Sequence, residues 1–177
     1  HRTNAYARLG EGDMAHTMIH NQIRDSIGNN LWSHYYVFQV EGNMGMTAGI
    51  SEMLLQSHDG ALHVLPALPD RWQDGKVSGL VARGGFVVDM EWKDGKIVEL
   101  KVLSRLGGNL RIRTASELAG KGLKEAAAEN ANPYYTVQDV PQPLISDPSK
   151  LGMEPAPETV LYDVDTKPGK TYIFTAK

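Results

Sequence analysis

The sequence predicts an α+β chain, with a helical first part and an antiparallel β-sandwich after it. Apolar residues recur with a period near 3.6 before residue 60, which indicates helices, and with a period near 2 after it, which indicates strands. We therefore expect two domains, residues 1–60 and residues 61–177. The second part, about 110 residues long, is sufficient for two packed sheets. The helical part is too short to bury its own apolar faces and is expected to need a partner surface.

Two helices are predicted in residues 1–60, after a short helical end at residues 5–9. Asp13 is placed to cap the first of them, and Gly-Asn-Asn at residues 28–30 ends it. The apolar residues of this helix repeat every four positions: Ala15, Ile19 and Ile23.

The second helix is expected to run from about Thr47 to Ser57, with its apolar residues on one face. Residues 31–40 are apolar and aromatic, and we interpret them as a buried connection between the helices. The polar, glycine-rich segment at residues 41–45 is then a turn that leads into the second helix.

Strands in the second part are predicted from alternating apolar residues and from turn residues. Residues 62–65 are a short strand. Residues 86–92 alternate, with Phe86, Val88, Met90 and Trp92 expected on one face. Lys-Asp-Gly-Lys at residues 93–96 is a hairpin turn of the Asp-Gly type. The strand after that turn is expected to place three residues inward: Val98, Leu100 and Val102.

The rest of the chain is less regular. A glycine turn at residues 107–109 precedes an alternating strand, which extends the predicted antiparallel meander. Residues 124–129 have helical propensity but no clear apolar face, and the proline-rich residues 133–157 are expected to be irregular. Two further strands, residues 160–164 and 171–175, are expected to close the sheet that begins at Leu62.

Composition excludes several classes of protein. The chain has 177 residues, 41% of them hydrophobic, so a packed core is expected rather than disorder. The net charge is −3, with no dense Lys/Arg run, which argues against a nucleic-acid partner. The chain has no cysteine, so it holds no disulfide and no thiolate metal site. No apolar run reaches the length of a membrane span.

The strongest concentration of chemical groups lies at residues 38–50, where a carboxylate and a carboxamide stand among glycines. Inverting glycosidases use one carboxylic acid to protonate the leaving oxygen, while a base, or amides oriented by a carboxylate, activates water on the opposite face. Glu41 is therefore the catalytic candidate. Three nearby residues are candidates for sugar binding: His34, Gln39 and Asn43. The alternative for Glu41, an exposed carboxylate in a turn, stays open.

Other patterns are better explained by structure than by chemistry. His16 and His20 stand four residues apart, but Thr17 occupies the position where a zinc protease has Glu, and no third ligand is evident. Gly42 and Gly45 precede a helix without the Lys of a phosphate-binding loop. Residues 83–85, Arg-Gly-Gly, occur once before a strand, which favours a turn. We expect no metal and no cofactor.

Several motifs, taken in order, resemble glycoside hydrolase family 95. The sequence ARLGEGDMA at residues 7–15 is one of them, and FQVEGN at residues 38–43 with TAGISEMLLQS at residues 47–57 is another. LPALP at residues 65–69 and GLVARGGFVVD at residues 79–89 continue the series. The resemblance covers about residues 4–113 and, more loosely, residues 162–172.

This resemblance implies an (α/α)6-barrel catalytic domain followed by a C-terminal β-sandwich. The chain is then expected to contain the last barrel helices and the sandwich. The implied reaction is inverting, exo-acting hydrolysis of terminal α-L-fucosides, with α-L-galactosides as a variant. By position, Glu41 takes the role of the acidic residue that supports the water-activating amides. The general acid is expected upstream, so this chain alone is expected to be an inactive fragment, which matches a start without Met. The resemblance also implies a secreted or periplasmic location.

Two departures from the family pattern leave alternatives open. The usual Asp is Glu41, one methylene longer, and the usual Phe-Gly after Asn43 is Met44-Gly45-Met46. The pocket is then either remodelled for another sugar or no longer catalytic. A competing hypothesis is a non-catalytic sandwich that supports the barrel or binds carbohydrate. Because Trp92 alternates with core residues and no row of exposed aromatics is evident, support outranks sugar binding for residues 70–177.

Overall fold

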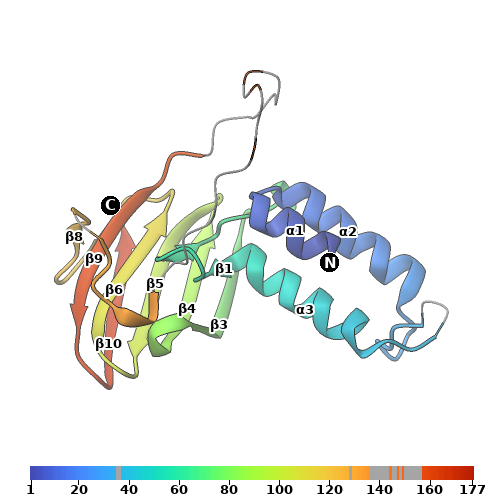
Figure 1. The fold of residues 1–177 in the computed structure, drawn as a ribbon, viewed down its shortest axis with the longest axis horizontal. Helices are drawn as coiled ribbons and strands as arrows, with labels where there is room; N and C mark the ends of the chain where they lie inside the picture. The colour runs from blue at the N-terminus through green and yellow to red at the C-terminus, as the bar shows by residue number, and fades with distance from the viewer. Residues whose placement is uncertain (35–36, 128, 136–143, 145–146, 148, 150–156) are drawn as a thin grey trace.

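The computed structural model describes residues 1–34, 37–127, 129–135, 144, 147, 149 and 157–177. Three helices lie on one side of the molecule and two β-sheets on the other (Figure 1). The chain is thus of the α+β class. The helices are α1 (Arg2–Leu9), α2 (Gly12–Ser26) and α3 (Val40–Leu54). No helix in the described part of the chain is long and apolar enough to cross a membrane.

Two five-stranded sheets make up the sandwich. The first sheet has the order β1-β2-β6-β9-β8 and the second the order β3-β4-β5-β10-β7. Of the strand pairs, β2 with β6 is parallel, and the other pairs are antiparallel. The strands of the first sheet are β1 (Leu55–Gln56), β2 (Leu62–Val64), β6 (Gly108–Thr114), β8 (Lys124–Glu125) and β9 (Val160–Thr166). Those of the second are β3 (Gly75–Ala82), β4 (Phe86–Lys93), β5 (Lys96–Ser104), β7 (Leu118–Gly120) and β10 (Lys170–Ala176).

Three short 3-10 helices complete the described elements: Asp70–Trp72, Arg83–Gly85 and Pro133–Tyr135. The predicted hairpin turn is confirmed, since Asp94 and Gly95 both have positive φ, at 49° and 72°, as a tight turn between antiparallel strands requires. Most of the predicted irregular segment, residues 133–157, lies outside the described residues.

The inward face of β4 is as predicted, but that of β5 is only partly so. Leu100 and Val102 are buried, whereas Val98 is 45% exposed and Ile97 takes its place in the core. The pairing of β4 with β5 shifts register between Glu91 and Trp92. Such a bulge inserts one extra residue and reverses the face of everything beyond it.

The prediction of one continuous meander is wrong. β5 and β6 follow one another in sequence but belong to different sheets. The last two strands separate in the same way, because β9 joins the sheet that contains β2 while β10 pairs with β5 and β7. Residues 124 and 125, where helical propensity was noted, are strand β8.

The helical elements also differ from expectation. Helix α3 begins at Val40, seven residues before the predicted start at Thr47, and ends at Leu54. Asp13 does not cap α2, which begins at Gly12 after Glu11. The Asp13 carboxylate instead accepts a hydrogen bond from the backbone N–H of Asp70 at 2.9 Å. Asp13 thus links α2 to the segment that leads into the sandwich.

The junction between helices and sandwich is closely packed. Gln56, which is 5% exposed, donates from its side chain to the backbone oxygen of Ala7 at 2.8 Å. A Cβ at Gly12 would lie 2.6 Å from the carbonyl carbon of Leu68, so only glycine allows this approach. His16 on α2 packs its ring edge-on against Trp72, with centroids 5.7 Å apart.

Candidate functional site

The predicted catalytic and sugar-binding residues lie around the start of α3, at the end remote from the sandwich (Figure 1). Glu41 is in the first turn of α3 and is exposed. A carboxylate in that position interacts favourably with the positive end of the helix dipole. Glu41 makes no hydrogen bond or ion pair with the described residues, so its carboxylate is accessible.

The predicted glycine turn is helical instead, because its glycines serve close packing. A Cβ on Gly42 would lie 2.7 Å from the hydroxyl oxygen of Ser33. A Cβ on Gly49 would lie 2.7 Å from the side chain of Thr3. These two glycines are seven residues apart, two helical turns, and therefore lie on one side of α3. The seven-residue spacing of Gly42 and Gly49 was a sequence signal for a helix in close contact with its neighbours. Our interpretation of the segment as a turn missed this signal.

Amide side chains from other segments hold the first half of α3. Gln22 on α2 donates to the backbone oxygen of Gly42 at 2.6 Å. Asn4 on α1 donates to the backbone oxygen of Gly45 at 2.9 Å. Both helices therefore fix the position from which Glu41 projects.

Asn43 joins this helix end to the loop that precedes it. Its Oδ1 accepts the backbone N–H of Ser33 at 3.0 Å, and its Nδ2 donates to the backbone oxygen of Leu31 at 2.6 Å. Ser33 is only 3% exposed and forms a β-bridge with Ile27. The carboxamide of Asn43 thus serves the loop, and its direct contact with a sugar stays a prediction.

The other two candidates for sugar binding, His34 and Gln39, are both exposed. His34 is held through its backbone N–H, which donates to the oxygen of Ser26 at 2.9 Å. Gln39 precedes α3 with extended backbone angles and makes no capping bond with its side chain. The structure therefore brings the loop at residues 31–34 to the start of α3, and Asn43 makes the connection.

The described residues of the segment 31–40 do not form the buried connection that we expected. Trp32 is 52% exposed and Phe38 44%, and their ring centroids are 4.1 Å apart. Leu31 and Val37 are exposed as well. Tyr35 and Tyr36 lie outside the described residues.

A cavity of about 650 Å³ lies elsewhere, between α1 and the first sheet, and includes Arg8, His58, Asp59, His63 and Arg113 among its lining residues. Arg113 pairs with Asp59, and Arg8 pairs with Glu52 of α3. Burial, helped by the charge of Arg113, lowers the pKa of His63 to about 4. Its charged groups have partners within the chain, so we interpret the cavity as part of the junction.

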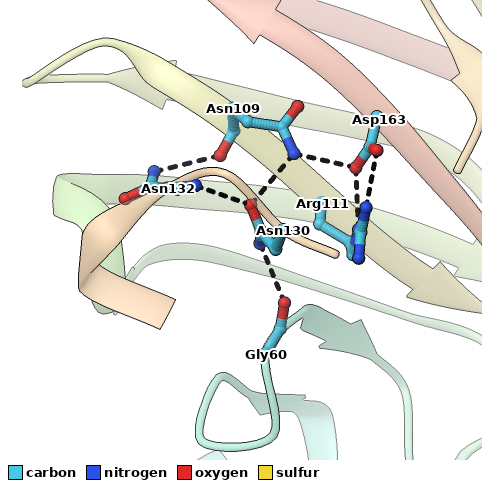
Figure 2. A network of polar contacts seen from close by, with 6 residues as sticks. All are labelled: Gly60, Asn109, Arg111, Asn130, Asn132 and Asp163. Carbon is cyan, nitrogen blue, oxygen red and sulfur yellow. Dashed lines mark hydrogen bonds and ion pairs between the residues drawn. The ribbon is translucent and has the colours of Figure 1, made fainter. Parts of the chain in front are cut away.

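Figure 2 shows a second polar cluster, in the sandwich. The Asn130 side-chain oxygen accepts bonds from the Asn109 side chain and the Asn132 backbone, both at 3.0 Å. Asn130 also donates to the backbone oxygen of Gly60 at 2.9 Å. These bonds tie the segment before the third 3-10 helix to β6 and to the connection between β1 and β2.

The charged residues of this cluster also bind each other. Arg111, which is 8% exposed, donates to both carboxylate oxygens of Asp163, at 2.8 and 2.7 Å. The hydrogen bond from Arg111 holds the pKa of the Asp163 carboxyl below its usual value. Since these groups bind one another across β6 and β9, the cluster is structural. No group of three or more potential metal-ligating side chains is found among the described residues.

Family comparisons divide the chain at the end of α3. Residues 1–54 match the glycosyl hydrolase family 95 catalytic domain, and residues 56–140 match the glycoside hydrolase family 95 C-terminal domain. The two matches belong to one family and together cover most of the chain. The chain therefore belongs to glycoside hydrolase family 95.

Curated relatives agree with this assignment. Alpha-L-fucosidase 2 from Arabidopsis thaliana is 37% identical over 111 residues, which are 56% of this chain and 13% of that protein. A probable alpha-fucosidase A from Aspergillus oryzae is 30% identical over 128 residues, 63% of this chain and 18% of that protein. The Aspergillus niger protein of the same name is 29% identical over 112 residues, 55% of this chain and 14% of that protein. The chain thus spans less than a fifth of each relative.

Proposed function

We propose that this chain is the C-terminal part of an exo-acting glycoside hydrolase that cleaves terminal α-L-fucosides by an inverting mechanism. Terminal α-L-galactosides are the second substrate class that we propose. Helices α1–α3 are the last helices of an (α/α)6 barrel, and the general acid lies on the part of the barrel that precedes them. Secretion, or a periplasmic location, belongs to the same proposal.

One observation carries this proposal: the segment that matches the family's catalytic domain exposes Glu41 at the end of α3 farthest from the sandwich. The carboxylate is accessible there, while Gln22 and Asn4 hold the backbone of the following turn. A catalytic group needs this combination, because its position must be fixed while its reactive atoms stay free.

The proposed chemistry divides the work between two faces of the sugar. A carboxylic acid from the preceding part of the barrel protonates the departing oxygen. Glu41 orients the amide groups that activate water on the opposite face, so the configuration at the anomeric carbon inverts. Because Glu41 is longer than Asp by one methylene, its carboxylate reaches farther, and the amides it orients are expected to lie correspondingly farther from α3.

The sandwich has a supporting role in this proposal. Gln56 bonds to Ala7 of α1 and Asp13 of α2 bonds to the segment before β3, so both helices are anchored to the sandwich near the connection between them. Trp92 is 5% exposed and donates its indole N–H to the backbone oxygen of Trp72 at 2.7 Å. That geometry favours a core role over a glycan platform for this tryptophan.

The test is substitution of Glu41 in the enzyme that carries this chain. Glu41→Gln removes the charge at constant size, and kcat is expected to fall about 10²- to 10⁴-fold with little change in melting temperature. Glu41→Asp, which restores the residue usual in the family, should retain more activity than Gln. Glu52→Gln in the same helix is the matched control, since Glu52 pairs with Arg8 near the sandwich, and its kcat should be near normal.

A near-normal kcat for Glu41→Gln would remove Glu41 from the site. The 177-residue chain alone should show no activity on fucosides or galactosides. Measurable turnover by it would contradict a general acid located elsewhere. The anomer first released, read by nuclear magnetic resonance, tests the inverting mechanism.

A further inference from the structure

Two aromatic rings at the start of α3 are exposed although they touch each other. The Trp32 and Phe38 centroids are 4.1 Å apart with the planes tilted by 40°, and about half of each side chain remains accessible. Large apolar groups gathered on a surface commonly mark a binding site. Phe38 lies three residues before Glu41, and Asn43 joins the loop that carries Trp32 to the start of α3, so the pair lies at the same end of α3 as the proposed catalytic residue.

The backbone that carries Trp32 is fixed at successive positions. The Trp32 N–H donates to the side-chain oxygen of Asn30, and its carbonyl accepts the N–H of Gly28, both at 3.0 Å. The residues on either side of Trp32, Leu31 and Ser33, are both bound by Asn43. An exposed side chain on a fixed backbone loses little conformational entropy when it binds a ligand.

Polar side chains lie next to this aromatic pair. A hollow of about 390 Å³ is lined by Asn30, Trp32 and His34. Gln39 follows Phe38 and is exposed. An apolar aromatic face with a few hydrogen-bonding groups at its rim is suited to a pyranose, which presents one face of C–H groups and a rim of hydroxyls.

From these observations we propose that Trp32 and Phe38 form a stacking surface for a sugar ring of the glycan, and that Asn43 is the positioning residue that holds it. This inference rests on the proposed function for the choice of sugar. It also changes the role expected for Asn43, which acts through the backbone of Leu31 and Ser33 rather than on the sugar itself.

Sugar binding by the stacking surface is tested on the 177-residue chain. Of its three tryptophans, Trp32 is the reporter, and Trp72 and Trp92 are internal controls. The indole N–H signals are followed by nuclear magnetic resonance while L-fucose, L-galactose or glycerol is added. The Trp32 signal should shift and saturate with either sugar and not with glycerol. The Trp92 signal should stay in place, because that indole is buried and bonded to Trp72.

Two outcomes of the titration would overturn the stacking surface: no movement of Trp32, or parallel movement of all three indoles. Substitutions in the enzyme that carries the chain give a second measurement. Trp32→Ala should raise KM about tenfold or more and leave kcat within about twofold, while Trp32→Phe should stay within about threefold in KM. Leu9→Ala, at a 73% exposed position on α1 outside this loop, is the matched control and should leave KM unchanged.

The positioning half is tested by Asn43→Ala and Asn43→Asp. Asp keeps the acceptor for the Ser33 N–H but places an oxygen against the Leu31 carbonyl, so both variants should raise KM about fivefold and broaden the Trp32 signal. An unchanged KM in both would overturn the positioning role. If Trp32→Ala lowers the melting temperature while KM stays normal, other helices of the barrel cover the pair, and stacking is wrong.

These results separate the inference from the proposed function. Glu41→Gln should lower kcat about 10²- to 10⁴-fold and leave the Trp32 titration unchanged. If Glu41→Gln keeps normal kcat while Trp32→Ala raises KM, the stacking surface stands and the catalytic role of Glu41 fails. The opposite pattern would reject the stacking surface alone.

Discussion

The helical part and the sandwich bury their apolar side chains in different ways. The sandwich encloses a continuous core in which large side chains such as Phe86, Leu100 and Phe174 are fully buried. Among the described residues, the core of the helical part consists of Ala7, Ala15, Ile19, Met53 and Ala67. Small side chains let helices approach closely but remove little area from water.

The helices and the loop before α3 also expose large apolar side chains. Leu9, Leu31, Val37 and Met44 are each at least 67% exposed. The two sheets of a sandwich bury each other's apolar faces, whereas a pair of helices needs a further layer of structure to cover its apolar surface. The two parts therefore contribute unequally to the stability of this chain, and the exposed surface of the helices is suited to packing against further helices.

The largest effect expected from this comparison is in the sandwich core. Phe86→Ala should lower the free energy of unfolding by about 3–5 kcal/mol, because it leaves a cavity in a closed core. Met44→Ala on α3, at a 68% exposed position, should change it by no more than about 0.5 kcal/mol. Urea unfolding followed by circular dichroism measures both. Equal losses would mean that the two parts do not differ as described.

Next in size is the effect of adding one methyl group at the junction. In Gly12→Ala the new Cβ meets the backbone of Leu68 at 2.6 Å, which cannot rotate away, and a loss of about 1–3 kcal/mol is expected. In Gly45→Ala nothing lies within 4 Å of the new Cβ, so α3 should gain about 0.4–1 kcal/mol. Thermal unfolding of both variants is the measurement. A neutral Gly12→Ala would show that the junction is loose.

The third effect is the dependence of the stability on pH. Burial lowers the pKa of His63 in the folded state to about 4, from an ordinary value of 6.5. Below pH 6.5 the unfolded chain binds this proton more readily, so the free energy of unfolding should fall as the pH drops from 6.5 to 4. Because the ring is partly exposed, about 1–2 kcal/mol is expected.

The sandwich should respond in a different pH window. The pKa of Asp163 is held below 3.8 by Arg111, so its contribution is present above that pH and is lost as the pH falls further. His63→Gln should therefore reduce the slope between pH 6.5 and 4 and leave the steeper loss below it. If the free energy of unfolding of this variant still falls as steeply between pH 6.5 and 4, groups other than His63 cause that fall.

Local sequence patterns predicted the elements in which one pattern, such as strict alternation, continues without interruption. β4 alternates without interruption, and the Asp94-Gly95 turn fixes where β5 starts. β3 was not predicted because its pairing with β4 shifts between Val77 and Leu80, around Gly79, which breaks the alternation. Val98 was placed on the wrong face for the same reason, since a bulge depends on both strands and only one is visible in a local pattern.

The candidate site was predictable in composition but not in geometry. The sequence places Glu41 and Asn43 two residues apart beside aromatic residues, and that grouping is present. Whether the glycines among them form a turn or a helix depended on neighbours: Ser33 lies against Gly42 and Thr3 against Gly49. The exposure of Trp32 could not be predicted from the sequence either, because it depends on which surfaces other segments cover.

Local sequence patterns were enough to predict the change from helical to strand periodicity near residue 60, which the structure has at residue 55, the hairpin at residues 93–96 and the identity of the polar groups around Glu41. Each rests on residues close together in the chain. The sequence patterns did not predict which strands share a sheet, where α3 begins or what Asn43 binds. Those outcomes depend on contacts between distant segments, where packing overrides local preference.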